Sequence, residues 1–509
     1  MFASVLKSRQ FCIVILLLPL SLGYIGGSAV GSETGRWQAL PWVEDFESGL
    51  RQAGKTGRPA LVYFQARWCS WCHIFERDIL GHPRLQRSIL QHYVPVLINY
   101  DARPKLFRQL GGVGLPYTVI VSPTGDPLAR LPGILSVKDM IAALDEIATG
   151  KTWLPVQIDA PTIRITRLDT PSYLAFRRAY LEYLDTLFEP ETGTFTRQLE
   201  SGVRIKRPAP VAWLYLAQQD LWPQRSRDAA HITMERLYDE VDGGLFYFRD
   251  PHRADEHLET SKLLDSNIWL AYWLAFVGKR DNDPALIHTA EQTVEYLEQV
   301  LWDTRAGGFY QAQIADPTYY SASRRERERR APPPIDRIKR TDTNAQAAWA
   351  LVKIGDLLDD EHTHDLAAAT LDYILQTNLR DNRLYHSYQD DSGYGVAFNL
   401  PNDLFWLLAT AQEVQRVRFD DRRRQKLQAV RGLAVEWLKG KMRAGDARGM
   451  PSELPGLIAW VTVSTHKPMW SAEATKWALT GVQIGPQTRP QDPVFALMAW
   501  EKLLANTVN

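Results

Sequence analysis

The sequence predicts an α/β domain followed by an all-α domain built as an (α/α)6 toroid. Up to about residue 150, short β-branched runs alternate with helical patterns, which is the arrangement of an α/β sheet. From about residue 165 onward, aromatic and aliphatic residues recur at helical spacing, and a pattern of helix, glycine and aromatic pair returns several times. We therefore expect domains at residues 37–150 and 165–509, joined by a proline-containing connector at residues 153–161.

Residues 1–30 are typical of an export segment. Lys7 and Arg9 precede an uncharged apolar run at residues 11–25, and small residues at 27–29 offer a cleavage site. The alternative is an uncleaved membrane anchor, because no charge occurs from residue 10 to residue 32. We expect a signal peptide and export to the periplasm or cell envelope, where disulfides persist. Only an uncleaved segment would contact the membrane.

The charge balance excludes one class of partner. The 509 residues contain 59 Lys and Arg and 59 Asp and Glu, so no global basic surface favours nucleic acid, and we expect none as a partner. The 17 Trp and 20 Tyr residues favour aromatic-rich helix packing or an aromatic-lined cleft.

The elements of the first domain follow one another in a simple order. Their expected ranges are a helix at 42–53, a strand at 60–65, helices at 69–80 and 82–91, a strand at 94–98, a helix at 103–110, a strand at 117–121, a strand ending at 133 and a helix at 137–148. The turn at residues 122–126 joins the last two strands, so we expect one antiparallel hairpin within the sheet.

The chemistry of this domain lies in residues 68–73, which read WCSWCH directly behind the first strand. A Cys-x-x-Cys that opens a helix places its first sulfur at the helix N-terminus, where backbone N–H groups favour the thiolate. This geometry predicts Cys69 as the nucleophile and Cys72 as the resolving thiol, provided that water reaches the first sulfur. The remaining cysteine, Cys12, lies in the N-terminal apolar run.

The order of elements, with this motif early and Gly114-Leu115-Pro116 later, resembles the thioredoxin fold. The resemblance implies that Pro116 is cis and lies against the two sulfurs, where neighbouring backbone pairs with an extended substrate segment.

Other residues near the pair are expected to support the redox site. These are the flanking Trp68 and Trp71, His73, which favours the thiolate or is a solvated surface group, and Glu76. Proteins that resemble this chain usually bury an acid on the strand before the motif, but Tyr63 lies close to that position. Glu76, one helical turn beyond Cys72, is the nearby carboxylate that could substitute, and we therefore expect slow or specialised exchange.

The second domain contains two recurring patterns. Helices that end in acidic residues lead through glycines to aromatic residues at 187–195, 237–246 and 301–310, with a degenerate copy at 384–388. Asp-Ser-Asn at 265–267, Asp-Thr-Asn at 342–344 and Asn-Asp at 402–403 open long apolar helices, as N-cap clusters do. The spacing leaves room for about twelve helices in alternating inner and outer rings.

Six-hairpin toroids commonly bind sugars in a cleft lined by paired carboxylates and aromatic platforms. The candidate cleft acids are Glu259, Asp265, Asp342 and Asp403, with Trp269, Trp349 and Trp406 nearby in the sequence. Helix capping and core packing are the competing roles for these residues. We interpret Lys262 and Glu259 as a surface pair, and the arginine-rich residues 324–330 as a mobile, solvated insertion.

Both domains together resemble the spermatogenesis-associated protein 20 family. The resemblance rests on residues 71–73 in the first domain and on residues 238–246, 257–259 and 307–310 in the second. It implies a thioredoxin-like domain fused to a six-hairpin toroid of the glycosidase type. Ser70 stands where such proteins usually have an inner histidine, and the acidic stretch after residue 310 is largely lost.

The favoured function is that of an exported thiol:disulfide oxidoreductase that acts on a protein disulfide or dithiol, with the toroid selecting or presenting the substrate. The alternatives are a toroid that binds or processes a carbohydrate ligand, and an interaction scaffold with a vestigial redox pair. We expect no cofactor and no metal, because no second Cys-x-x-Cys is present and the nearby histidines have an unfamiliar spacing for zinc.

Overall fold

The computed structural model describes residues 37–112, 114–152, 162–198, 204–249, 257–389, 393–444, 450, 452–464, 472–485 and 488–507. The export segment at residues 1–30, Cys12 and the connector at residues 153–161 lie outside the described residues. Within those ranges no helix combines the length and apolar character needed to cross a bilayer.

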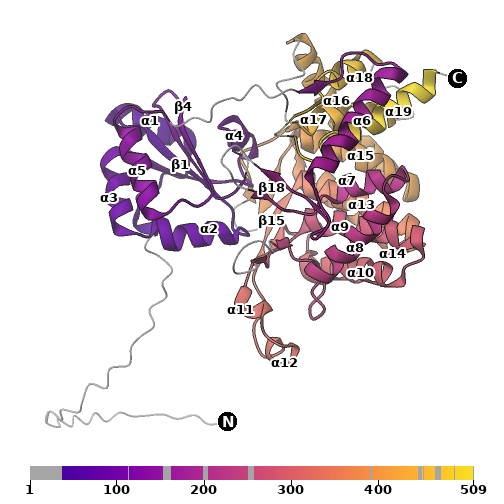
Figure 1. Cartoon of the computed structure of the whole chain (residues 1–509). Helices are drawn as coiled ribbons and strands as arrows, with labels where there is room; N and C mark the ends of the chain where they lie inside the picture. Colours follow the sequence, from indigo (N-terminus) through magenta and orange to yellow (C-terminus); the bar gives the residue numbers. More distant parts are fainter. Residues whose placement is uncertain are drawn as a thin grey trace, which may run out of the picture.

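The N-terminal α/β domain is built on a four-stranded sheet with the order β2-β1-β3-β4 (Figure 1). Strand β1 pairs with β2 in parallel and with β3 antiparallel, and β3 and β4 form the expected hairpin. The elements are η1 Trp37–Ala39, α1 Phe46–Thr56, β1 Ala60–Gln65, α2 Ser70–Ile74, η2 Phe75–Leu80, α3 Pro83–His92, β2 Val94–Asn99, α4 Pro104–Gln109, β3 Tyr117–Val121, β4 Pro127–Pro132 and α5 Val137–Ala148.

Alternate residues of β1 enter two different cores, as the period of two along a strand requires. Leu61 and Tyr63 pack in the core that includes η2, α3 and α5. Val62 and Phe64 pack in the core that includes α1 and α4. The sheet is therefore covered on both faces, and the end of β1 delivers the cysteine motif to the margin of the domain.

The C-terminal domain is an (α/α)6 toroid, as the sequence predicts. In the described residues, six inner helices contact one another in a closed ring in the order α7, α9, α13, α15, α17, α19, and six outer helices alternate with them along the chain. The inner helices are α7 Pro210–Gln218, α9 Leu264–Asp281, α13 Thr341–Leu358, α15 Pro401–Val417, α17 Leu454–Ser464 and α19 Val494–Thr507. The outer helices are α6 Thr170–Leu187, α8 Pro223–Leu237, α10 Pro284–Tyr296, α14 Glu361–Tyr373, α16 Asp421–Arg443 and α18 Ala472–Leu479.

Short elements occupy the connections at the ends of the helices. They are β5 Ile163–Arg164, β6 Phe188–Glu189, β7 Thr194–Phe195, β8 Arg197–Gln198, β9 Arg204–Ile205, β10 Phe248–Arg249, β11 Leu258–Glu259, β12 Lys262–Leu263, η3 Leu297–Leu301, β13 Ala312–Gln313, α11 Pro317–Tyr320, α12 Arg324–Arg327, β14 Ile335–Asp336, β15 Ile338–Arg340, η4 Ile374–Asn378, β16 Leu379–Arg380, β17 Arg383–Leu384, β18 Ser387–Gln389, β19 Gly393–Tyr394 and β20 Gln483–Ile484.

The ring is closed by its first and last helices. Strand β5 pairs with β20, and α19 packs against both α6 and α7. Tyr173 and Phe176 of α6 contact the ring of the buried Trp500, and the Tyr180 hydroxyl donates to the carbonyl of Pro490 at 2.6 Å. Segments more than 300 residues apart therefore share one core.

The recurring Asp-x-Asn pattern locks the preceding loops and does not cap the helices. The N-cap positions of α9 and α13 are Leu263 and Arg340, and neither side chain makes a capping bond. Instead Asn267 bonds both the N–H and the C=O of Leu245, and Asn344 bonds the same two groups of Phe309. The predicted N-cap role is therefore wrong for these two copies.

Two of the repeats also bury a lysine. Lys262 donates to Asp239 at 2.8 Å and to the carbonyl of Gly243 at 2.6 Å, and Lys339 makes the equivalent bonds to Asp303 at 2.5 Å and to the carbonyl of Gly307 at 2.9 Å. Both lysines are fully buried. The interpretation of Lys262 as a surface partner of Glu259 is wrong, because the residues around it form a strand and not a helix.

The arginine-rich insertion is folded. It contains α12, which projects from the toroid together with the preceding α11 in Figure 1, and it is held by Arg327. The Arg327 guanidinium is 7% exposed and donates to both carboxylate oxygens of Asp239 at 2.9 Å and to Asp242 at 3.0 Å. The segment is therefore anchored through a buried ion pair, while its other residues, 324–326 and 328–330, are exposed to solvent as expected.

Candidate functional site

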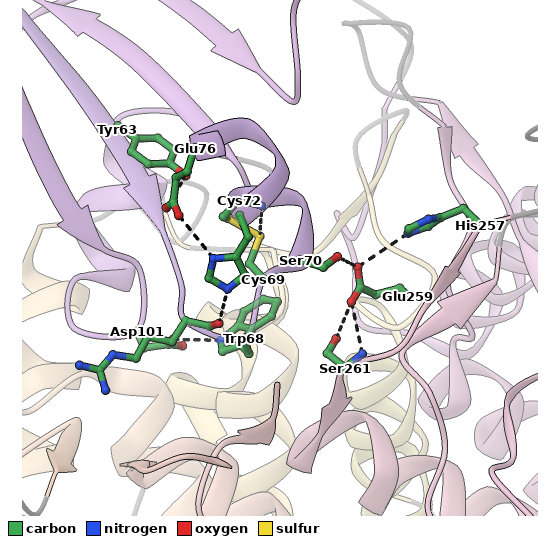
Figure 2. Close-up of a disulfide and its surroundings, with 12 residues drawn as sticks. Tyr63, Trp68, Cys69, Ser70, Cys72, Glu76, Asp101, His257, Glu259 and Ser261 are labelled. Atoms are coloured by element: carbon green, nitrogen blue, oxygen red, sulfur yellow. Dashed lines mark hydrogen bonds and ion pairs between the residues drawn. A yellow bond between two sulfur atoms is a disulfide. The ribbon is translucent and has the colours of Figure 1, made fainter. Parts of the chain in front are cut away.

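The thiol pair lies where β1 passes into α2. Cys69 is the N-cap residue of α2, and its sulfur accepts the backbone N–H of Cys72 at 3.1 Å. A disulfide joins Cys69 and Cys72, whose Cα atoms are 5.2 Å apart. Figure 2 shows this bridge between the helix of its own domain and residues of the toroid.

Burial of the pair departs from the expectation of a water-accessible first sulfur. Cys69 is 5% exposed and Cys72 is fully buried. Trp68, Trp71 and Leu115 pack against them. The peptide bond between Leu115 and the buried Pro116 is cis, as the thioredoxin resemblance implies. The face that exchanges disulfides in this fold is therefore covered.

Glu76 is held by its own domain. Its carboxylate is 6% exposed, accepts the hydroxyl of Tyr63 at 3.1 Å, and lies 3.4 Å from Nδ1 of His73. The Nε2 atom of His73 lies 2.8 Å from the carbonyl oxygen of Arg67. The bond to Glu76 raises the pKa of His73, and burial offsets part of this effect. Tyr63, which replaces the usual acid, thus anchors the carboxylate expected to substitute for it.

Toroid residues from β10, β11 and the segments beside them cover the motif. Glu259 is 3% exposed, and its carboxylate accepts the hydroxyl of Ser70. The ring of His257 lies 4.5 Å from the ring of Trp71 between centroids, and Tyr247 meets Trp68 edge-on at 6.2 Å. Glu259, expected in the toroid cleft, therefore faces the redox motif. No sequence signal could have found this contact, because 189 residues separate it from Ser70.

A second bridge between the domains is ionic and buried. The indole N–H of Trp68 donates to Asp101 at 3.0 Å, and the Arg340 guanidinium donates to the other oxygen of Asp101 at 3.1 Å. Arg340 also holds both carboxylate oxygens of Asp342, at 3.1 and 2.8 Å. Burial alone would lower the pKa of Arg340, but Asp342 and Asp101 raise it well above its usual value. Sequence reasoning missed Asp101 and Arg340.

The same network contains the one set of three or more metal-ligand side chains found among the described residues, namely Asp342, His386 and Asp403. Their candidate donor atoms lie within 4.8 Å of one another. Both oxygens of Asp342 are occupied by Arg340, however, and both oxygens of Asp403 lie 2.9 to 3.0 Å from Nδ1 of His386. The side chains thus neutralise one another, and the adjacent guanidinium disfavours a cation.

A cavity of about 560 Å³ lies between the two domains. The α/β domain contributes Trp68, Gly114 and Leu115 to its wall. The toroid side is lined by inner-helix residues and by residues of the adjoining connections, including Arg207, Tyr247, Asp265, Trp269, Gln311, Arg340, Asp342, Gln346, Asn402, Trp406, Glu453 and Arg489. Of the predicted cleft acids, Asp265 and Asp342 line this chamber, whereas Glu259 and Asp403 do not.

The chamber walls are polar as well as aromatic. Burial raises the pKa of Asp265, and Arg340 offsets part of this effect. Gln346 accepts the indole N–H of Trp269 at 2.9 Å, and the buried side-chain oxygen of Asn402 has no hydrogen-bond partner among the described residues. Trp269 and Trp349 pack against each other with ring centroids 5.5 Å apart, but Trp349 does not line the chamber.

Comparison with known proteins identifies the kind of domain that contains the thiol pair. Residues 46–148 match the model of a family described as a thioredoxin-like domain. The N-terminal domain is thioredoxin-like. Over 106 residues, 20% of this chain, it is 27% identical to the thiol:disulfide interchange protein DsbD 1 of Pseudomonas aeruginosa.

The similarity extends beyond the thioredoxin-like domain. Over 377 residues, 64% of this chain, the protein is 20% identical to human spermatogenesis-associated protein 20. The matched regions span 17% of DsbD 1 and 43% of spermatogenesis-associated protein 20. The cellobiose 2-epimerase of Spirochaeta thermophila superposes with a TM-score of 0.50 at 14% identity, over 68% of this chain and all of that one. This likeness supports the toroid fold alone.

Proposed function

We propose that the protein is a thiol:disulfide oxidoreductase that uses the Cys69–Cys72 pair. The observation that carries the proposal is a Cys-x-x-Cys disulfide at the start of α2 in a thioredoxin-like domain. Leu115, which precedes the cis-proline, packs against this pair. The similarity to a thiol:disulfide interchange protein supports the same chemistry.

In this reaction Cys69 is the nucleophile. Its N-cap position and the N–H of Cys72 stabilise the thiolate, which attacks one sulfur of a substrate disulfide. Cys72, fully buried behind it, then attacks the mixed disulfide, closes the Cys69–Cys72 bond and releases the substrate as a dithiol. The reverse sequence oxidises a substrate dithiol.

The toroid controls access to the pair. Because Cys69 is 5% exposed and toroid residues contact both flanking tryptophans, a protein substrate reaches the sulfur only when the two domains separate locally. Opening of this kind is common where domains meet through polar contacts. We propose that the toroid in this way selects or presents the substrate.

A redox titration of the purified chain tests the proposal. Equilibration with dithiol and disulfide buffers, followed by thiol alkylation and mass measurement, is expected to show one bridge that forms and breaks reversibly. Cys69→Ser is expected to abolish exchange with a disulfide substrate, and Cys72→Ser to accumulate a mixed disulfide on Cys69. Exchange at the wild-type rate in Cys69→Ser would exclude the pair as the reactive group.

A second function is favoured by the chamber. Trp269 and Trp406 offer aromatic surfaces beside the carboxylates of Asp265 and Asp342, which is the composition of a sugar site. As the second function, we propose that this chamber takes a carbohydrate ligand. The probes are cellobiose, which occurs in the name of the structural neighbour, and a panel of mono- and disaccharides. Saturable binding that survives Cys69→Ser but is lost in Asp265→Asn would support this function, and no binding by any probe would refute it.

We further propose that residues 1–30 export the protein to the periplasm or cell envelope. The proposal rests on the basic residues and apolar run of that segment. Fractionation of cells and N-terminal sequencing of the recovered protein test it, and recovery from the cytoplasm with the segment intact would refute it.

A further inference from the structure

The carboxylate of Glu259 is a toroid group inside the redox site. Glu259 belongs to strand β11 of the toroid and is 3% exposed. Its hydrogen-bond donors among the described residues are the hydroxyl of Ser70, the hydroxyl of Ser261 at 3.0 Å and the N–H of Ser261 at 3.3 Å. Figure 2 shows it pointing at the turn that joins the two cysteines.

Two other carboxylates near the motif, Asp101 and Glu76, have basic partners. Asp101 pairs with Arg340 at 3.1 Å, and Glu76 lies 3.4 Å from His73, whose pKa it raises. Arg67 is exposed to solvent. Within the described residues the one basic group within 4 Å of Glu259 is His257, at 3.8 Å. Of these three acids, Glu259 is the one whose negative charge is held mainly by hydroxyl and backbone donors.

We propose that Glu259 disfavours the thiolate form of Cys69 and thereby makes the reduced pair an electron donor. This inference rests on the proposed oxidoreductase function and adds its direction. The disulfide is neutral, whereas the reduced pair carries a thiolate on Cys69, the residue before Ser70, whose hydroxyl bonds the buried Glu259 carboxylate. The negative charge of Glu259 therefore favours the disulfide. Dithiol proteins that oxidise their substrates show the opposite effect, because they stabilise the thiolate and hence the reduced form of the pair.

The reaction that follows is a reduction of the substrate. The Cys69 thiolate forms a bond to one substrate sulfur, the substrate S–S bond breaks, and the departing thiolate takes a proton. Cys72 then loses its proton and forms the Cys69–Cys72 bond, which releases the second substrate thiol. Two electrons pass from the pair to the substrate. Cys72 supplies one of the two protons, and the other comes from solvent, to which Cys69 released it on ionising. A dithiol donor must then reduce the pair again.

Glu259→Gln tests the assignment, because glutamine keeps the shape and the acceptor for Ser70 but removes the charge. In the reduced protein we expect the pKa of Cys69, followed by the ultraviolet absorbance of the thiolate, to fall by about one unit, the lower end of the effect of a neighbouring charge. The equilibrium with a reference dithiol should shift about tenfold toward the reduced pair, or about 30 mV. Glu295→Gln, an exposed toroid carboxylate on α10, is the control and should change neither value.

Ser70→Ala separates an electrostatic role from a structural one. It leaves the carboxylate charged but removes a donor that offsets the charge, so the pKa of Cys69 and the redox equilibrium should move in the opposite direction. The inference is overturned if wild type exchanges disulfides normally while both variants keep the wild-type pKa and equilibrium, or if both variants shift the same way. A wild-type protein whose bridge does not cycle would instead refute the oxidoreductase function itself.

Discussion

Replacement of Arg340 by glutamine should release the cover from the disulfide. The guanidinium donates three bonds of 2.8 to 3.1 Å, one to Asp101 of the thioredoxin-like domain and two to Asp342 of the toroid. Removing one partner of a buried ion pair costs about 3 to 5 kcal/mol, because the remaining charges stay desolvated. Glutamine retains part of the hydrogen bonding, so we expect about 3 kcal/mol.

This loss of free energy destabilises the closed arrangement of the domains relative to the open one, because both carboxylates regain water when the domains separate. At 1.36 kcal/mol per factor of ten, the population of the open form should rise about a hundredfold. The assay is the rate at which a small dithiol reduces the Cys69–Cys72 bridge, followed by alkylation and mass measurement, under conditions where circular dichroism shows the chain to be folded.

Two further variants should change the reduction rate less than Arg340→Gln does. Asp101→Asn leaves Arg340 paired with Asp342, so its effect on the reduction rate should be smaller. Arg337→Gln removes an exposed arginine three residues before Arg340 and should leave the rate unchanged. A wild-type rate in Arg340→Gln would refute the reasoning, because it would mean either that the ion pair does not hold the domains together or that the reductant reaches the bridge without their separation.

Three other changes test the fold and its electrostatics. Lys262→Met leaves Asp239 short of a cation in a buried setting and should lower the free energy of unfolding in urea by about 3 kcal/mol or more; an unchanged midpoint would contradict the assigned pair. Burial raises the pKa of Asp336 to about 7, above its value of 3.8 in the unfolded chain, so stability should fall as pH rises from about 4 to 7 and level off above; Asp336→Asn should flatten this slope and stabilise the protein at pH 8 by up to about 4 kcal/mol in urea titrations. Gly308→Ala places a Cβ 2.3 Å from the Tyr373 ring at a φ of +74°, and should lower the melting temperature by several degrees, whereas a wild-type value would mean that the loop adapts freely.

Much of the fold was predictable because its determinants are local. The apolar strand at residues 60–65 and the helix at residues 137–148 have the bounds that the sequence predicts. The motif helix differs, since it passes after Ile74 into a π-helical segment that periodicity does not indicate. The toroid was predictable from repetition, because the glycine turn and the helix start recur in several successive helix pairs.

The candidate site was predictable only where one domain builds it. Cys69 and Cys72 are three residues apart, and their pairing follows from helix geometry. The burial of Cys69 was not foreseen, because the residues that cover it come from the other domain. The bond from Arg340 to Asp101 joins positions 239 residues apart, and neither position belongs to a motif. A contact of this kind produces no periodic pattern in the sequence, so periodicity does not predict it.

Closure of the toroid by its final helix has a consequence for biosynthesis. During translation the thioredoxin-like domain emerges complete, with its dithiol, long before residues 494–507 leave the ribosome. Until α19 inserts between α17 and α7, the ring cannot hold Glu259 and Arg340 against the motif. A nascent or C-terminally truncated chain should therefore display permanently unshielded, reactive thiols, whereas the finished chain exposes them only while its two domains are locally separated.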